Sequence, residues 1–106
     1  STPMGDVSEA QAVRAVFGDA TDKLLVTSTK GATGHALGGA GGIESVFTVL
    51  SIRDQVVPAT LNLTELDPKC PIRVCAGKPE KMPVNVAMKN NFGFGGTNGT
   101  LIFRKL

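Results

Sequence analysis

The chain contains no tryptophan and no tyrosine, a single histidine and only two cysteines among its 106 residues. Without tryptophan or tyrosine it lacks the large rings on which bases and sugars commonly stack. No apolar run is long enough to cross a bilayer and no signal-peptide pattern opens the chain, so neither a membrane span nor a secretory leader is expected. With no sign of secretion, Cys70 and Cys75 are expected to be two reduced thiols rather than a disulfide.

Charge and motif spacing exclude further classes of protein. The net charge is only +2 and the eleven basic residues are scattered, which argues against nucleic-acid binding. The two cysteines and one distant histidine do not supply four metal ligands at usual spacings, so no metal site is expected. The glycines match neither the phosphate-binding loop nor the dinucleotide-binding pattern. The 42% hydrophobic content is enough for one modest domain over residues 1–106.

What the chain does have is glycine, thirteen residues that fall mostly in two clusters. The pattern around them predicts a mixed α/β fold. A first helix, capped by Asp6 or Ser8, would carry a stripe of Ala10, Val13, Val16 and Phe17. The further elements expected are a strand at 24–27, a helix at about 38–53, an extended segment at 56–61, a loop-like stretch at 62–82, and strands at 84–89 and 100–104.

The first glycine cluster surrounds the only histidine, in the segment Lys-Gly-Ala-Thr-Gly-His at residues 30–35. His35 is expected just before a helix N-terminus, where the helix dipole disfavours a protonated ring. A neutral imidazole there can donate a hydrogen bond to a developing oxyanion or enolate, and Lys30 adds a positive charge. The alternative, about equally open, is a structural histidine whose ring nitrogens form hydrogen bonds with backbone groups of a tight loop.

The helix that follows begins with four glycines, each unfavourable by roughly 1 kcal/mol relative to alanine. Close approach of another backbone would compensate, so this helix is expected to be buried in a larger body. Glu44 would lie in it, where a buried carboxylate needs a partner and Lys30 is the nearest candidate. An exposed helix glutamate is the equally open alternative.

The second glycine cluster, at residues 92–98, joins the two predicted C-terminal strands and holds more glycine than a plain hairpin needs. Such a loop offers backbone N–H groups and a movable aromatic, which suits an anion nest or a gated pocket wall. The simpler alternative is a mobile loop whose Phe92 and Phe94 fill the core.

Together these segments resemble the C-terminal part of the elongating β-ketoacyl-acyl carrier protein synthases, of the thiolase-like superfamily. Residues 1–6 resemble the tail of the family's His-Gly-Thr-x-Thr-Pro-x-Gly-Asp motif, residues 30–35 its lysine–histidine motif and residues 91–98 its C-terminal glycine loop. Residues 58–63 fit as well. The resemblance spans essentially the whole chain in the family's order and implies a layered αβαβα fold. The ketosynthases of polyketide synthases are a close second.

The resemblance implies an acyltransferase of fatty-acid biosynthesis that performs a decarboxylating Claisen condensation. An acyl thioester would react with malonyl on acyl carrier protein to give the 3-oxoacyl product, with no cofactor beyond the carrier's phosphopantetheine arm. By motif position, His35 would bond the malonyl thioester oxygen and stabilise the enolate, and Lys30 would order the site through Glu44.

The other residues carried over by the resemblance would contact the substrate. Phe94 would be the gate beside the acyl pocket, and its N–H would join the oxyanion hole. Thr2 would bond the pantetheine arm, and Phe92 and Gly95 would line the substrate site.

The start of the chain, Ser-Thr-Pro-Met-Gly-Asp, has no initiator methionine and reads as the middle of a turn, so a fragment of a longer protein is expected. The nucleophilic cysteine and first histidine of the family would lie upstream, and the chain alone is expected to be inactive. The expected partners are acyl carrier protein, the missing N-terminal half and a second copy in a homodimer. The compartment would be the bacterial cytoplasm, a mitochondrion or a plastid. The alternatives are a non-catalytic module for a pantetheine or other anion, and a structural piece ordered only against its missing half.

Overall fold

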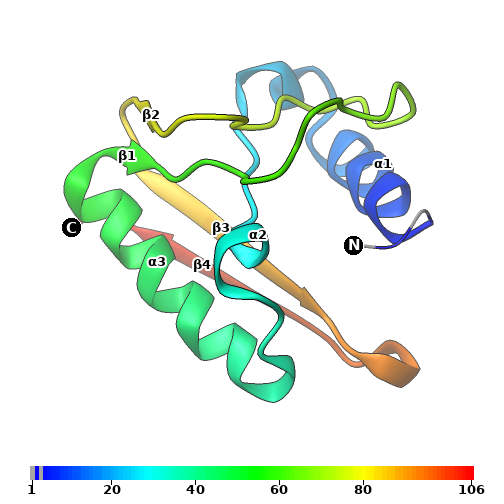
Figure 1. Cartoon of the computed structure of the whole chain (residues 1–106). Coiled ribbons are helices and arrows are strands. Elements are labelled where there is room, and N and C mark those ends of the chain that lie inside the picture. The colour runs from blue at the N-terminus through cyan, green and yellow to red at the C-terminus, as the bar shows by residue number, and fades with distance from the viewer. Residues whose placement is uncertain (1, 3) are drawn as a thin grey trace.

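The computed structural model describes Thr2 and residues 4–106 and confirms the mixed α/β fold (Figure 1). In chain order the elements are α1 (Gly5–Phe17), α2 (Lys30–Thr33), α3 (Ala40–Asp54), β1 (Val56–Val57), β2 (Glu80–Lys81), β3 (Val86–Phe92) and β4 (Asn98–Arg104). Short 3₁₀ helices cover Gly18–Lys23, Leu37–Gly39 and Phe94–Gly96. None of the helices among these residues is long and apolar enough to cross a membrane.

The two C-terminal strands form the predicted hairpin, and it is longer than expected. β3 and β4 pair antiparallel from Val86 opposite Arg104 to Phe92 opposite Asn98, so ladder pairing reaches the edge of the glycine loop. On β3 the side chains alternate between the two faces, and Lys89 lies on the covered one. The hairpin therefore presents residues next to the glycine loop to whatever covers that face.

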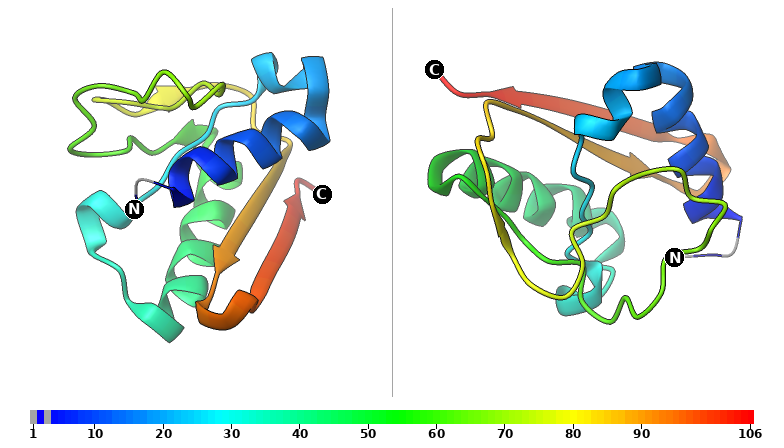
Figure 2. Two further views of the ribbon diagram at one scale, coloured as in Figure 1. Left: turned by 90° about the vertical axis from the view of Figure 1, so that its right-hand side faces the viewer. Right: turned by 90° about the horizontal axis from the view of Figure 1, so that it is seen from above.

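Helix α3 covers this face of the hairpin and runs alongside both strands (Figures 1 and 2). Its start was predicted at residue 38, where a 3₁₀ turn precedes the α-helix. Ile43, Val46 and Val49 on α3 remain 42–57% exposed in this chain. A helix that is apolar on the outward side as well is typical of one buried within a larger protein.

The close backbone approach predicted for the glycines of α3 is not seen at Gly41 among the described residues. A Cβ on Gly41 would lie 3.2 Å from the Asn91 side chain, so side chains and not a backbone occupy this space. Nothing in the described part of the chain lies within 4 Å of a Cβ built on Gly38 or Gly42.

The core lies at the C-terminal end of α3. Ile52, Val57, Cys75 and Val84 form a buried cluster. Gln55, in the left-handed conformation that ends α3, donates to the carbonyls of Ile52 and Val84 and accepts from the Val84 N–H. One side chain thus joins the end of the helix to the segment leading into β3.

Three predictions for the N-terminal third need correction. Helix α1 begins at Gly5, ahead of both Asp6 and Ser8, and Val16 is 78% exposed because it lies away from the face that carries Ala10. Residues 24–27 form only an isolated parallel bridge from Val26 to Val74 instead of a strand. The extended segment predicted at 56–61 is found up to Thr60, and Leu61 lies in a turn. Within 62–82 only β2 and isolated bridges interrupt the loop.

Candidate active site

Lys30 and Glu44 form the ion pair that the sequence indicated. The Lys30 ammonium, at the start of α2, donates to Oε1 of Glu44 on α3. The Glu44 side chain is only 14% exposed and that of Lys30 is 31% exposed. The exposed alternative for Glu44 is therefore wrong, and the pair joins the segment before His35 to the helix after it.

Two residues of β3, which sequence reasoning missed, extend this pair. Asn91 Nδ2 donates to Oε2 of Glu44 at 2.7 Å, and Lys89 Nζ donates to Oδ1 of Asn91. Lys30, Glu44, Lys89 and Asn91 are called the Glu44 network below. Both carboxylate oxygens of Glu44 accept a bond, so the network satisfies a charge that would otherwise be costly to bury.

The network lowers the pKa of Glu44 below its ordinary value of 4.5. Burial alone would raise this pKa, but the hydrogen bonds from Lys30 and Asn91 and the positive charges of Lys30 and Lys89 together outweigh it. Glu44 is thus a carboxylate near neutral pH.

The sign of this shift predicts how stability depends on pH. Because the pKa of Glu44 is lower in the folded protein, ionised Glu44 stabilises the fold fully above 4.5, and this contribution is lost as the pH falls through the folded-state pKa. Glu44→Gln is expected to lower the thermal midpoint at about pH 7 and to have a smaller effect at about pH 3. Thermal unfolding at several pH values checks this, with Glu65→Gln at an exposed carboxylate as the control. A difference that does not change with pH would contradict a role for the charge.

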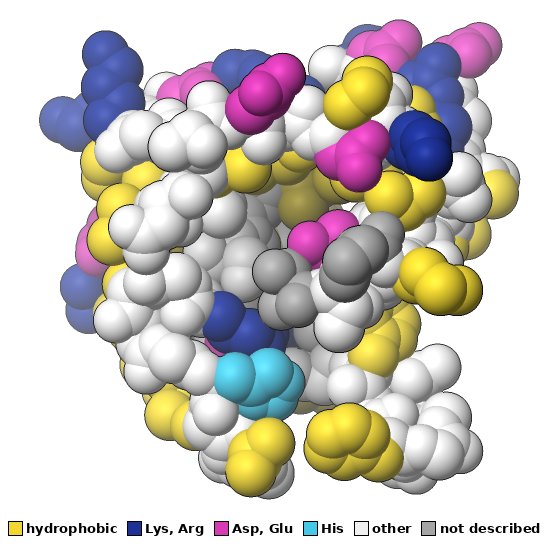
Figure 3. Space-filling view, turned by 45° about the vertical axis from the view of Figure 1, so that its right-hand side comes forward, with side chains coloured by type: hydrophobic (Ala, Val, Ile, Leu, Met, Phe, Trp, Pro, Cys, Tyr) yellow, Lys and Arg dark blue, Asp and Glu magenta, His cyan; other side chains and the backbone are white. Residues whose placement is uncertain are grey.

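His35 is exposed, and its ring is oriented by the backbone. Nδ1 accepts the N–H of Leu37 at 3.0 Å, so in the neutral ring the proton resides on Nε2. Nε2–H is then a hydrogen-bond donor. The single histidine lies beside a basic side chain at the edge of a hollow (Figure 3). A 3₁₀ turn separates His35 from α3, so it is farther from that helix terminus than predicted.

Hydrogen bonds hold the Lys30–His35 segment, and Ser28 just before it, against residues 58–62. The Ser28 N–H donates to the Thr60 hydroxyl at 3.0 Å, and Asn62 Nδ2 donates to the Gly31 carbonyl at 3.1 Å. A Cβ on Gly31 would lie 2.5 Å from the carbonyl oxygen of Leu61, so only glycine permits this approach. The close backbone contact expected for the glycine-rich helix is found here instead.

This contact predicts that Gly31→Ala destabilises the protein by about 1–3 kcal/mol, since the new methyl group overlaps a backbone atom that cannot rotate away. Gly99→Ala is the matched control, because a Cβ there meets nothing within 4 Å among the described residues. Chemical denaturation of both variants measures the effect. Equal stability of the two would contradict the packing argument.

The second glycine loop projects its aromatic side chain outward. Phe94 is 95% exposed and Phe92 is 57% exposed, so the reading in which they fill the core is wrong for this chain. Gly95 has a φ of 72° within the loop, and the N–H of Gly93 donates to the Thr97 carbonyl at 2.8 Å across its base. In this chain the loop is closed at its base by a backbone hydrogen bond and exposed at its tip.

Thr2 lies before α1, and its hydroxyl accepts the N–H of Gly5 at 2.9 Å. This bond satisfies one of the unpaired donors of the first helical turn, the role predicted for Asp6 or Ser8. The hydroxyl proton of Thr2 still has the capacity to donate to a ligand.

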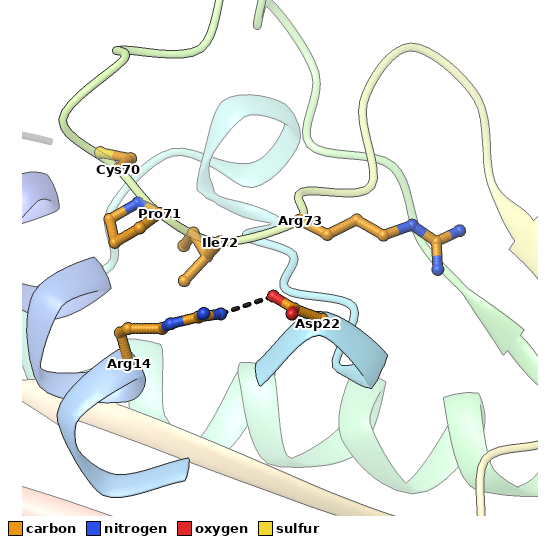
Figure 4. A pocket seen from close by; sticks show the side chains of 6 residues that line it. All are labelled: Arg14, Asp22, Cys70, Pro71, Ile72 and Arg73. Atoms are coloured by element: carbon orange, nitrogen blue, oxygen red, sulfur yellow. Dashed lines mark hydrogen bonds and ion pairs between the residues drawn. The ribbon is translucent and has the colours of Figure 1, made fainter. Parts of the chain in front are cut away.

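The cysteines lie apart from this chemistry. Cys70 and Cys75 are free and buried, and burial raises the pKa of both thiols. Cys70 borders a cavity of about 490 Å³ that shares no residue with the Glu44 network. Figure 4 shows that Arg14 pairs with Asp22 there, while Arg73 points away from this pair. The described residues hold no cluster of three or more histidine, cysteine or acidic side chains suited to a metal.

Comparison with known proteins places this geometry in a family. A model of the β-ketoacyl synthase C-terminal domain matches residues 1–64. The 3-oxoacyl-[acyl-carrier-protein] synthase 2 of Coxiella burnetii is 46% identical over 106 residues, which are 100% of this chain and 26% of that protein. The corresponding enzyme of Synechocystis is 47% identical over 99% of this chain and 25% of its own length.

Solved structures agree with the sequence relatives. A β-ketoacyl synthase from Burkholderia phymatum matches with a TM-score of 0.91 and 39% identity, over 99% of this chain and 25% of that one. A type II polyketide ketosynthase solved in complex with its acyl-carrier protein matches with a TM-score of 0.95 and 33% identity, over 100% and 26%. The chain spans about a quarter of the length of these relatives. It therefore belongs to the β-ketoacyl synthase family, as the C-terminal part of such an enzyme with the thiolase-like α/β fold.

Proposed function

We propose that a protein of full family length containing this chain, called the intact protein below, condenses an acyl thioester with malonyl on acyl carrier protein. Carbon dioxide leaves, and the product is 3-oxoacyl-acyl carrier protein. The observation that carries the proposal is the ring orientation of His35. Because Nδ1 accepts a backbone N–H, Nε2–H is the ring's donor, and it stabilises the oxyanion of the enolate formed by decarboxylation.

The other residues support His35 or hold the substrate. Lys30 and Glu44 fix the segment that carries His35. Phe94, at the free tip of its loop, gates the acyl pocket, and its N–H contributes to the oxyanion hole. Thr2 bonds the pantetheine arm, while Phe92 and Gly95 line the channel beside it.

The proposed partners follow from the same assignment. Acyl carrier protein delivers both substrates, the preceding part of the intact protein supplies the nucleophilic cysteine and the first histidine, and a second copy forms a homodimer. The apolar outward side of α3 supports burial in such a larger body. The relatives named above are bacterial, which favours a bacterial cytoplasm over a mitochondrion or plastid.

A polyketide ketosynthase is the second candidate, because one matches the fold at 33% identity. The fatty-acid enzymes are more similar in sequence, at 46–47% identity, and so favour fatty-acid elongation.

The test is turnover by the intact protein. Incubated with an acyl carrier protein loaded with hexanoate and with malonyl carrier, it should form the eight-carbon 3-oxoacyl carrier, detected by mass spectrometry. Without malonyl carrier, a cysteine upstream of this chain should carry the acyl group and lose it on heating with hydroxylamine. Residues 1–106 alone should do neither. Absence of both products with the intact protein favours a non-catalytic binding module, and turnover by residues 1–106 alone would refute the assignment of the nucleophile.

A further inference from the structure

Lys89 is a lysine on the covered face of β3, and it is only 8% exposed. Its strand neighbours Met88 and Asn90 lie on the other face, and the partly buried Ala87 and Asn91 share its own. A lysine in such a position is costly unless its charge is paired. The function proposed above assigns it no role.

The Lys89 ammonium reaches Glu44 through one side chain. Nζ donates to Oδ1 of Asn91, whose Nδ2 donates to Oε2 of Glu44 at 2.7 Å. A Cβ on Gly41 would lie 3.6 Å from Nζ and 3.2 Å from Oδ1 of Asn91. The small size of Gly41 thus leaves room for the lysine beside the helix.

The hydrogen bonds of the Glu44 network connect the segment that carries His35 with the loop that carries Phe94, and the proposed reaction requires both. Lys30 begins the segment that ends at His35, and β3 leads through Asn91 directly into the loop that carries Phe94. Glu44, between them, accepts from both sides. Asn91 and Glu44 thus link the strand that leads into the Phe94 loop to the segment that carries His35.

We propose that Lys89 is a positioning residue for the condensation, a second cation for Glu44 that holds the Phe94 loop in register with His35 through Asn91. This inference rests on the proposed function. Lys89 does not touch the reacting atoms. It orients the amide of Asn91 so that its NH₂ group points to Glu44, and its charge adds to that of Lys30 in favouring the ionised carboxylate.

The charges around Glu44 come from three elements. Lys30 on α2 and Lys89 on β3 are positive, and Glu9 on α1 is a nearby carboxyl whose pKa is raised by burial and further by negative neighbours that include Glu44. Without Lys89, Lys30 is the one remaining cation of the Glu44 network. The acidic limb of the pH–activity profile is then expected to move to higher pH.

The experiment compares three variants of the intact protein. Lys89→Met removes the charge and keeps the length of the side chain, whereas Lys89→Arg retains a positive charge. Lys81→Met is the control at an exposed lysine on β2. A cavity of about 390 Å³ borders Lys89 in this chain, and the longer arginine side chain is expected to extend into it. We expect Lys89→Met to lower kcat about tenfold with KM for malonyl carrier nearly unchanged. Lys89→Arg should recover most of the activity, and Lys81→Met should match the parent protein.

A double-mutant cycle separates positioning from general support of the fold. In a Glu44→Gln background no carboxylate is left to be paired, so Lys89→Met should lower kcat by less than about twofold. The same tenfold loss in both backgrounds, or no recovery with arginine, would overturn the proposal. If Lys89→Met does not fold, Asn91→Ser breaks the same connection while keeping the lysine, and full activity of that variant would also overturn it.

Thermal unfolding provides a readout that does not depend on turnover. Non-additive effects of Lys89→Met and Glu44→Gln on the midpoint support the coupling, and additive effects overturn it. An intact protein that shows this coupling but no condensation would refute the proposed function and with it the positioning role, and Lys89 would remain only a counter-ion of Glu44 in the fold.

Discussion

Replacing His35 with alanine in the intact protein is expected to abolish malonyl decarboxylation while leaving acyl transfer to the upstream cysteine largely intact. Removing one donor from an oxyanion site costs about 10²–10³-fold in rate. The donor here is Nε2–H, fixed by the bond between Nδ1 and the Leu37 N–H. The enolate arises only in the decarboxylation step, so only that step should suffer.

The two steps are measured separately. Release of carbon dioxide from malonyl carrier reports decarboxylation, and mass spectrometry of the protein after incubation with acyl carrier reports acyl transfer. His35→Gln is an informative companion, since its amide can donate a hydrogen bond and should retain part of the activity. Equal loss of both steps in His35→Ala would refute the role assigned to this residue.

Replacing Glu44 with alanine is expected to damage both stability and turnover. The Lys30 ammonium and the Asn91 amide both lose their acceptor, and a partly buried cation is left without its partner. The expected loss of stability is about 2 kcal/mol, and condensation should fall by about 100-fold because the His35 and Phe94 segments are no longer held together.

Glu65→Ala is the matched control, because this carboxylate is exposed and lies in the loop-like stretch. The thermal midpoint and kcat are measured for both variants on the same preparation of carrier substrates. A Glu44→Ala protein that keeps full turnover would show that the network supports folding alone.

The pairing of Lys30 with Glu44 could be predicted because a carboxylate among glycines in a helix had no other nearby partner. The hairpin could be predicted because two apolar runs flank a glycine loop. The burial of Lys89 could not be predicted, since a lysine at the end of an apolar strand normally faces solvent. Only tertiary packing places it against α3. A signal was available in Gly41, whose missing side chain makes the space that Asn91 and Lys89 fill.

The remaining differences arise from contacts between distant segments. Residues 24–27 have strand-forming residues but find only Val74 as a partner, so they remain a single bridge. The helix cap was misplaced because Thr2, three residues before Gly5, supplies the oxygen from outside the helix. The ring orientation of His35 depends on a backbone N–H two residues later, which composition and spacing do not reveal.

The attachment of the Lys30–His35 segment to residues 58–62 limits how such enzymes can be recombined. Ser28 bonds to Thr60, Gly31 bonds to Asn62, and Gly31 leaves no space for a side chain against Leu61. A chimera whose crossover falls within α3 would take the lysine–histidine segment from one parent and residues 58–62, which it contacts, from the other. Crossovers that keep residues 28–62 together transfer both as a unit.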